Sequence, residues 1–320
     1  MRKIVKRRGE TSNLEDPTLI GGYYTQEDIK EIIDYANKRF IEIIPEIELP
    51  GHSSAALAAY PELSCTGGPF EVPNRWGIFA DVYCPGKDIV YEFLQNVIDE
   101  IGTLFPTNII HIGGDEVPKK RWKSCPDCNK KLKKENLSKV SKLQVYLTNY
   151  FAKYLETKGK RLMGWNQILD EELAETAIFQ YWFGRRKEAI KHIERGRKVV
   201  MSTYLSTYLD HPYKIIPLQK AYKYEPIFKE LEEKYHANVL GMDPPLWTER
   251  VPNTKRLYWQ AFPRLTAYAE TSWSPRDKKN YRRFLAKLEL FVVRLQKMGI
   301  TPAIDKIDMI KSNFIEGKKR

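Results

Sequence analysis

The spacing of apolar residues changes repeatedly along the chain. In segments 25–40, 87–105 and 143–159, apolar residues recur every three or four positions, which predicts amphipathic helices. Thr25 opens the first segment with Asp28 three residues later, a variant of the capping box that marks a helix start. Further helical patterns occupy residues 187–195, 254–272 and 276–298.

Short apolar runs that end in polar or aromatic residues lie between the helical segments, and each run predicts a buried strand. We expect six such strands, at 40–52, 108–116, 160–165, 177–182, 198–202 and 238–247. Strands that alternate with helices, without internal repeats, indicate βαβ units and a parallel sheet. The sequence therefore predicts an α/β fold.

The carboxyl ends of the predicted strands carry side chains capable of chemistry. They are Glu46, His52, Asp115, Glu116, Trp165, Trp182, Tyr204 or Tyr208, Trp247 and Glu249. In parallel α/β folds, functional residues gather at this edge of the sheet. Core packing would explain any one of these tryptophans alone. Their shared position in successive units favours a ring-shaped site.

The strand at 108–116 ends in Gly113, Gly114, Asp115 and Glu116. Neighbouring side chains of a strand point to opposite faces, so the two acids enter one pocket only if the backbone turns, as glycines permit. The acids could cap the next helix, or they could share a pocket in which repulsion keeps one of them protonated, as a general acid requires. Carboxylates beside tryptophans favour the second interpretation, as glycoside hydrolysis.

Composition narrows the class of protein. A chain of 320 residues, 42% of them hydrophobic, can build one large domain or two small ones. No run of about 18 apolar residues occurs, so we expect no membrane span. The basic N-terminus lacks the apolar stretch of a signal peptide, which leaves localisation undetermined.

The net charge is +12, and basic residues gather near the start, in 119–135 and at the C-terminal end. A nucleic-acid or anionic-surface partner is one interpretation of this charge. Because no nucleic-acid-binding motif accompanies it, we favour a solvated, lysine-rich surface.

The four cysteines raise the question of a metal site. Cys125 and Cys128 form a CxxC motif, whereas Cys65 and Cys84 are single. A zinc ribbon uses two CxxC pairs, so we expect a local disulfide or two free thiols rather than a metal at Cys125 and Cys128. Cys65 and Cys84 could form a disulfide in an oxidising compartment.

The hexapeptide HIGGDE, residues 111–116, resembles the signature of family 20 glycoside hydrolases, the β-N-acetylhexosaminidases. Further stretches resemble that family's other blocks in the same order, from GGYYTQEDIKEII at residue 21 to FPRLTAYAE at residue 262. The resemblance implies a (β/α)₈ TIM barrel with its site at the carboxyl ends of the strands. It also implies a retaining mechanism that the substrate's own acetamido group assists.

The resemblance assigns roles to the matching residues. Glu116 would protonate the glycosidic oxygen and later activate water, and Asp115 would hold the acetamido N–H. Tyr208 would donate a hydrogen bond to the acetamido carbonyl, and His52 would belong to the polar network behind the acids. The sugar would be bound by Asp210, Glu249, Trp165, Trp182 and Trp247. Glu46 and His111 would be weaker members of the network, and a purely structural role is the alternative for both histidines.

The resemblance is incomplete at the N-terminus. Family members carry two further barrel strands before the block at residue 21, the first ending in a sugar-binding arginine, and nothing in 1–20 resembles them. We expect a basic lead-in at 1–20, a partial catalytic barrel of about six strands at 21–300 and a polar tail at 301–320. Such a chain would be a fragment or truncated product, weakly stable, nearly inactive and prone to form homo-oligomers through exposed barrel edges.

The expected function is therefore that of an exo-β-N-acetylhexosaminidase acting on terminal GlcNAc or GalNAc of glycans or chitin oligosaccharides. We expect no metal, no organic cofactor, and neither nucleic acid nor membrane as a partner. Two alternatives remain open: a non-catalytic carbohydrate-binding remnant of such an enzyme, and a nucleic-acid-binding protein suggested by charge alone.

Overall fold

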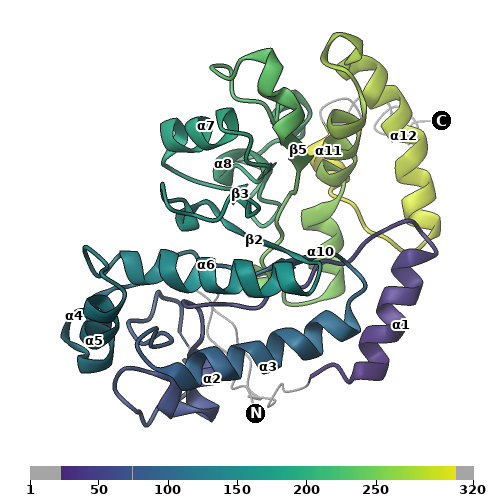
Figure 1. Ribbon diagram of the computed structural model, residues 1–320. Coiled ribbons are helices and arrows are strands. Elements are labelled where there is room, and N and C mark those ends of the chain that lie inside the picture. Colours follow the sequence, from purple (N-terminus) through teal and green to yellow (C-terminus); the bar gives the residue numbers. More distant parts are fainter. Residues whose placement is uncertain (1–22, 74, 308–320) are drawn as a thin grey trace, which may run out of the picture. The chain divides into compact units, whose positions relative to one another are not determined.

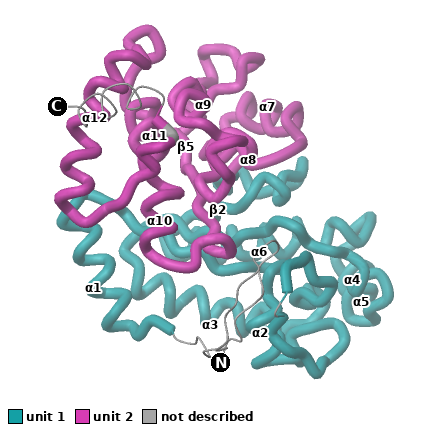
Figure 2. The backbone as a smooth tube through the Cα atoms, turned by 180° about the vertical axis from the view of Figure 1, so that it is seen from behind, with its two compact units in different colours: residues 1–179 teal, residues 180–320 magenta. Residues whose placement is uncertain are grey.

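The computed structural model describes residues 23–73 and 75–307. The chain forms two compact units, Met1–Phe179 (unit 1) and Gln180–Arg320 (unit 2) (Figure 2). The lead-in expected at 1–20 and most of the tail expected at 301–320 lie outside the described residues. No helix within the described residues is both long enough and apolar enough to cross a bilayer.

Five strands, counted over the described residues, follow one another through the sheet in chain order. They are β1 (Ile109–His111), β2 (Arg161–Trp165), β3 (Ile178–Tyr181), β4 (Val199–Met201) and β5 (Val239–Met242). β1 pairs with β2 in parallel, and β4 pairs with β5 in parallel. The predicted parallel α/β sheet is confirmed, and each strand lies inside a predicted one.

The segment predicted as a strand at 40–52 lies beside β1 but does not form a regular strand. Ile47 N–H donates to His111 O at 2.8 Å, Leu49 N–H donates to Ile112 O at 2.9 Å, and Glu46 forms an isolated parallel bridge with His111. Pro45 and Pro50 flank these contacts and have no N–H to donate, so the hydrogen-bond ladder stops at both ends. The prediction was right about position and wrong about regularity.

Six α-helices and two 3₁₀ helices lie in the described part of unit 1: α1 (Gln26–Asn37), α2 (Ser54–Ala59), η1 (Pro61–Leu63), α3 (Asp88–Leu104), α4 (Lys120–Ser124), α5 (Pro126–Lys134), α6 (Lys142–Thr157) and η2 (Asn166–Ile168). The capping box predicted at Thr25 and Asp28 is present at the start of α1. α3 and α6 lie side by side (Figure 1), joined by a 3.0 Å hydrogen bond from Gln95 to Tyr150.

The described part of unit 2 contains α7 (Arg186–Glu194), α8 (Tyr204–Thr207), α9 (Leu218–Lys223), η3 (Glu233–Asn238), η4 (Thr248–Arg250), α10 (Thr254–Ala261), α11 (Arg264–Trp273), η5 (Arg276–Lys278), α12 (Tyr281–Lys297) and η6 (Ile304–Lys306). The single helix predicted at 254–272 is two helices, because Pro263 cannot donate an intrahelical hydrogen bond. Buried side chains of α9, α11 and α12, among them Tyr222, Tyr268 and Leu288, form the core of this unit.

Candidate active site

The chain turns sharply after β1, where the two acids follow the two glycines. Gly113, Gly114 and Glu116 have φ angles of 65°, 86° and 47°, all in the left-handed region. A Cβ on Gly113 would lie 1.9 Å from Glu48 Oε2, and one on Gly114 would lie 2.4 Å from Ile168 Cγ2. Both glycines are thus required by conformation and by space, whereas Glu116 bears a strain of about 1–2 kcal/mol.

Neighbouring side chains hold this turn in place. Gln167 Oε1 accepts a 2.9 Å hydrogen bond from the backbone N–H of Glu116, and Gln144 Nε2 donates to Gly114 O at 2.7 Å. Lys119 Nζ donates to Val117 O at 2.9 Å on the far side of the acids. A strained residue persists only where its surroundings determine its conformation, as these bonds do.

The turn points both carboxylates at one histidine. His52 Nε2 lies 3.4 Å from Asp115 Oδ2 and 3.5 Å from Glu116 Oε2. The approach is close, because a Cβ on Gly51 would lie 2.9 Å from the carbonyl oxygen of Asp115. The helix-cap interpretation of the acids is wrong: α4, the next helix, has Lys119 as its N-cap and no side-chain capping bond.

The electrostatics of the three side chains divide their roles. The hydrogen bond to Asp115, joined by the charges of Asp115, Glu48 and Glu116, outweighs burial and raises the pKa of His52 to about 9. Burial and the charge of Asp115 raise the pKa of Glu116, while His52 opposes them. Near neutral pH the arrangement favours a cationic imidazole on His52 beside a Glu116 carboxyl group that holds its proton more strongly than usual.

Trp165 and His111 hold Glu46 behind these residues. Trp165 Nε1 donates to Glu46 Oε1 at 2.9 Å, and His111 Nδ1 lies 3.1 Å from the same oxygen. Burial acts against ionisation of Glu46, but the hydrogen bonds from His111 and Trp165 prevail and lower its pKa. Trp165 is only 4% exposed, so its indole is fixed both by packing and by this bond.

Glu48 is a site residue that sequence reasoning missed. Burial and the charges of Glu46 and Asp115 raise the pKa of Glu48 to about 8, with His52 opposing. The signal was in the sequence: in the extended stretch PEIELPG, acids two positions apart point to the same face. A third carboxyl group, protonated at neutral pH, therefore lies behind Asp115.

In unit 2, Tyr204 links two of the predicted site residues. Its ring centroid lies 5.9 Å from that of Trp182 and 5.1 Å from that of Tyr208, in edge-on contacts. Trp182 directly follows β3, and the backbone N–H of Tyr204 donates to Trp182 O at 2.9 Å. The His211 ring also contacts Tyr204, at 4.6 Å, and the sequence analysis did not single it out.

Asp210 lies in a loop that a buried arginine organises. Arg264, with no exposed surface, donates to His211 O and to Gln260 O, each at 2.8 Å. Burial raises the pKa of Asp210, its own backbone N–H opposes this, and the charge of Glu249 adds to it. Asp210 Oδ1 is buried and has no hydrogen-bond partner among the described residues. It is thus available to a donor from a bound molecule.

The structure therefore groups the predicted residues within each unit. Unit 1 brings together His52, Asp115 and Glu116, with Trp165 on the adjoining Glu46. In unit 2, the Tyr204 ring contacts both Trp182 and Tyr208, and the charge of Glu249 contributes to the raised pKa of Asp210. Trp247 and Glu249, which follow β5, are exposed. Two neighbouring acids, of which Glu116 has a raised pKa, can perform acid–base chemistry on a sugar, and aromatic rings can contact its apolar face.

Comparison with known sequences agrees with this chemistry. The sequence profile described as glycosyl hydrolase family 20, catalytic domain, matches residues 4–276. A beta-hexosaminidase of Porphyromonas gingivalis is 42% identical over 304 residues, which are 91% of this chain and 39% of that protein. A beta-hexosaminidase of Akkermansia muciniphila is 31% identical, covering 92% of this chain and 62% of that protein. The chain thus spans less than two thirds of the length of either relative.

Solved structures show the same likeness. A beta-N-acetylhexosaminidase from Bacteroides fragilis superposes with a TM-score of 0.78 at 34% identity, over 88% of this chain and 58% of that one. An exo-beta-N-acetylglucosaminidase from Vibrio harveyi, solved with N-acetylglucosamine, gives a TM-score of 0.79 at 29% identity, over 88% of this chain and 46% of that one. The predicted (β/α)₈-barrel class is confirmed.

Proposed function

The chain belongs to glycosyl hydrolase family 20, and we propose that it is an exo-acting β-N-acetylhexosaminidase. Its substrates would be glycans or chitin oligosaccharides that end in β-linked GlcNAc or GalNAc. Catalysis would reside in the domain at 21–300, with Asp115 and Glu116 as the catalytic residues. The N-acetylglucosamine bound by the Vibrio harveyi relative supports the choice of sugar.

The contact of both carboxylates with a single atom, His52 Nε2, carries this proposal. In a double-displacement glycosidase, two carboxyl groups flank the scissile bond about 5–5.5 Å apart. Here Asp115 and Glu116 stand next to each other on one turn of the chain, and one oxygen of each lies within 4.8 Å of the other and of a ring nitrogen of His52. Two acids on one side of the site suit a mechanism in which the substrate supplies its own nucleophile.

In the proposed first step, Glu116 donates its proton to the glycosidic oxygen as the bond to the anomeric carbon breaks. The carbonyl oxygen of the 2-acetamido group forms the new bond to that carbon, giving an oxazolinium-like intermediate. Asp115 accepts a hydrogen bond from the acetamido N–H and balances the positive charge that develops there. Asp115 Oδ1 is buried without a partner among the described residues, and such an acceptor suits this role.

In the second step, Glu116, now ionised, takes a proton from water as the water oxygen attacks the anomeric carbon. The acetamido oxygen leaves, the two inversions restore the original configuration, and both carboxyl groups return to their starting state. The raised pKa of Glu116 supports this double role, because an acid–base group acts best when its pKa lies near the working pH.

Sugar binding is proposed for six further residues. Tyr208 would donate to the acetamido carbonyl, and Asp210 and Glu249 would accept hydrogen bonds from ring hydroxyls. Trp165, Trp182 and Trp247 would contact the apolar faces of the sugar. The 42% exposure of Trp247 supports such a contact, since an indole face matches the C–H face of a sugar ring.

The test is turnover of two substrates by Glu116→Gln and Asp115→Asn. Loss of a general acid typically costs ~10²–10⁴ in rate. Glu116→Gln should lose about this much on substrates with a poor leaving group and much less on activated aryl N-acetylglucosaminides, which need little protonation. Asp115→Asn should impair both substrates alike, because the acetamido group loses its orientation.

Glu71→Gln, an exposed acid of unit 1, is the matched control and should behave as the wild type. Equal losses of Glu116→Gln on both substrates would contradict its role. Sugar binding without turnover by the wild type would favour the carbohydrate-binding remnant. A covalent glycosyl-enzyme trapped in a mass spectrum would refute substrate assistance.

A further inference from the structure

The four cysteines of the chain converge in unit 1, although they stand up to 63 positions apart. The sulfur atoms are separated by 3.8 Å for Cys65 and Cys128, 3.7 Å for Cys84 and Cys125, and 3.6 Å for Cys84 and Cys128. All four sulfurs lie within 4.8 Å of one another. A disulfide bond measures about 2.05 Å, so these are contacts between thiols.

The sulfur separations are those of a tetrahedral metal site. Four thiolates at about 2.3 Å from a zinc ion stand about 3.8 Å apart along the edges of a regular tetrahedron. We propose that Cys65, Cys84, Cys125 and Cys128 bind one zinc ion as a structural site. This proposal departs from the expectation of no metal at Cys125 and Cys128, because two single cysteines from the ends of one loop bring two further sulfurs to the CxxC pair.

The burial of the four cysteines indicates a structural zinc site and not a catalytic one. Cys84 and Cys128 have no exposed surface and Cys125 is 4% exposed, while Cys65 is partly buried. Four protein ligands complete the coordination of zinc and leave no position for a substrate or an activated water.

The loop that carries Cys84 is shaped to approach the CxxC turn. A Cβ on Gly86 would lie 2.3 Å from the backbone nitrogen of Cys128 and 2.3 Å from the carbonyl carbon of Asp127, so no side chain fits there. The missing side chain at Gly86 lets the two segments approach closely enough for the Cys84 and Cys128 sulfurs to meet at 3.6 Å.

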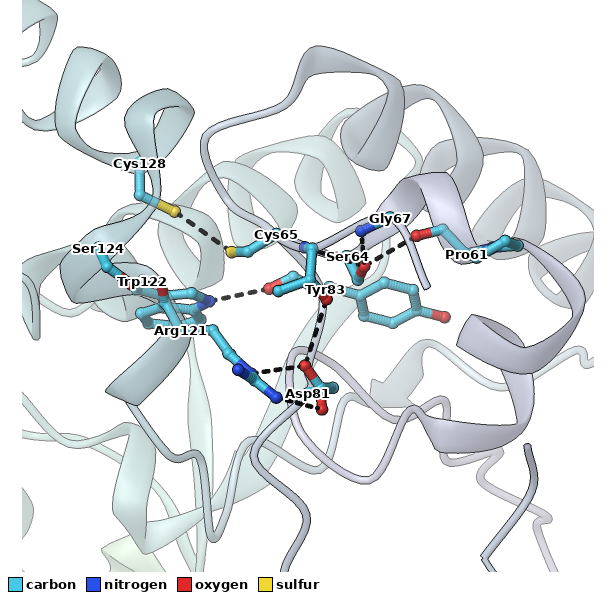
Figure 3. Close-up of polar contacts among 11 residues, drawn as sticks. Pro61, Ser64, Cys65, Gly67, Asp81, Tyr83, Arg121, Trp122, Ser124 and Cys128 are labelled. Atoms are coloured by element: carbon cyan, nitrogen blue, oxygen red, sulfur yellow. Dashed lines mark hydrogen bonds and ion pairs between the residues drawn. The ribbon is translucent and has the colours of Figure 1, made fainter. Parts of the chain in front are cut away.

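Polar contacts near the thiols join the loop between Cys65 and Cys84 to the segment that carries Cys125 and Cys128 (Figure 3). Ser64 and Tyr83 form an antiparallel bridge at the base of the loop, next to Cys65 and Cys84. Trp122 Nε1 donates to Tyr83 O at 3.0 Å, and Arg121 Nε donates to Asp81 Oδ1 at 2.7 Å (Figure 3). These bonds join the loop to α4, directly before Cys125, so the ligands are brought together by the surrounding fold.

The positive charge of the surrounding sequence is compatible with a zinc ion bound by four thiolates. Zinc with four thiolates carries two net negative charges, and the segment 119–135, which contains Cys125 and Cys128, is the most basic part of the described chain. Lys87 lies nearby and donates to Ser64 O at 2.7 Å. The basic residues that flank Cys125 and Cys128 in the sequence would offset part of this charge.

The site borders both segments that carry the catalytic residues. Tyr83 N–H donates to Pro50 O at 3.1 Å, two residues before His52. α4 begins four residues after Glu116 and ends directly before Cys125. Zinc would thus fix the ends of a loop and a helix pair that flank the catalytic turn. Its loss should lower stability first and activity as a consequence.

The test begins with the full chain expressed in zinc-supplemented medium and freed of loosely bound metal. We expect about one zinc per chain by mass spectrometry of metals, released when a mercurial reagent blocks the thiols, and four free thiols after denaturation. Exchange with cobalt(II) should give the visible absorption bands of a tetrahedral thiolate site. These measurements do not depend on activity.

Cys65→Ser removes the least buried ligand and so disturbs the core least. Its zinc affinity should fall by more than the ~10–100-fold that loss of an outer-shell partner costs. Ser124→Ala, an exposed neighbour of Cys125, is the matched control and should keep its zinc. Wild-type protein with no zinc and no cobalt bands would overturn the proposal, as would disulfides among the four cysteines. Iron in place of zinc would overturn the choice of metal.

Discussion

Glu48 is a third carboxyl group beside Glu46 and Asp115. Its ionisation is less favourable in the folded state than in the unfolded state, so it lowers the free energy of unfolding. Its pKa is about 8 when folded, against 4.5 for an ordinary glutamate. Below pH 4.5 both states are protonated and the group contributes nothing. Between pH 4.5 and 8 only the unfolded state ionises, so stability falls progressively, and above pH 8 the full cost is present.

Glu48→Gln should therefore be more stable than the wild type at pH 8, on the order of 2 kcal/mol, and nearly equal to it at pH 5. The full pKa shift would give more, but relaxation of the protein and entry of water around a buried charge reduce the cost of ionisation. Urea unfolding at the two pH values measures the difference. Glu71→Gln should show no such pH dependence, and a Glu48→Gln difference that is the same at both values would contradict the assignment.

Two constraints act on Gly113, its left-handed backbone conformation and its close contact with Glu48, and their costs can be measured separately. Gly113→Ala should cost about 2–4 kcal/mol, since its new methyl group meets Glu48 and its φ of 65° disfavours any side chain. Gly159 has a φ of 69° but no atom within 4 Å of a built Cβ. Gly159→Ala should therefore cost only the backbone part, about 1 kcal/mol. Thermal unfolding measures both, and equal losses would show that the contact with Glu48 is unimportant.

Among single residues, the sequence reveals those that belong to a local motif. Asp115 and Glu116 stood out because two glycines precede them and because they follow a strand end, where functional residues gather in parallel α/β folds. Arg264 carried no such signal, because its role depends on carbonyl groups that chain folding brings around it. The thiol cluster was missed for the same reason: contacts between cysteines 41 to 63 positions apart leave no local periodicity.

Among the elements, the long periodic helices were predicted well and the irregular ones poorly. α3 and α6 have continuous apolar stripes, and their bounds fall within two residues of the predicted ones. α4 and α5 were not predicted, because their lysine-rich sequence has few apolar positions from which a period can be read. They are short helices fixed by Trp122 and the buried thiols, that is, by tertiary contacts.

The first residue of α11, Arg264, holds the loop that carries Asp210, a proposed sugar-binding residue. Arg264 donates to carbonyl groups of the loop that carries Asp210, and its guanidinium lies 4.1 Å from the centroid of the Tyr213 ring. Arg264→Met should cost about 2–4 kcal/mol, because it leaves buried carbonyls without donors. It should also weaken substrate binding through Asp210. Arg282→Met on the exposed side of α12 should change stability by no more than about 0.5 kcal/mol.

Denaturant unfolding and steady-state kinetics of the two arginine variants form the test. A loss in kcat/KM for Arg264→Met with unchanged unfolding would show that the arginine meets the substrate directly. Equal behaviour of both variants would show that the hydrogen bonds to the loop contribute little.

For the whole molecule, the net charge of +12 should attract polyanions without regard to their sequence. We expect weak, sequence-independent binding to duplex DNA at about 50 mM salt that disappears by about 200 mM, because such binding depends on counterion release. Turnover of a neutral aryl glycoside should not change over the same range. Sub-micromolar DNA binding that survives at the higher salt would revive the nucleic-acid interpretation.

The convergence of Cys65 and Cys128 also determines how the molecule responds to force. With zinc bound, the 63 positions between them form a closed loop that cannot extend when the chain is pulled from its ends. At about 3.3–3.6 Å per residue, this loop hides roughly 210–230 Å of contour length until the metal–thiolate bonds break. Optical-tweezer traces of zinc-loaded and zinc-stripped protein should therefore differ by a single additional rupture that releases this length.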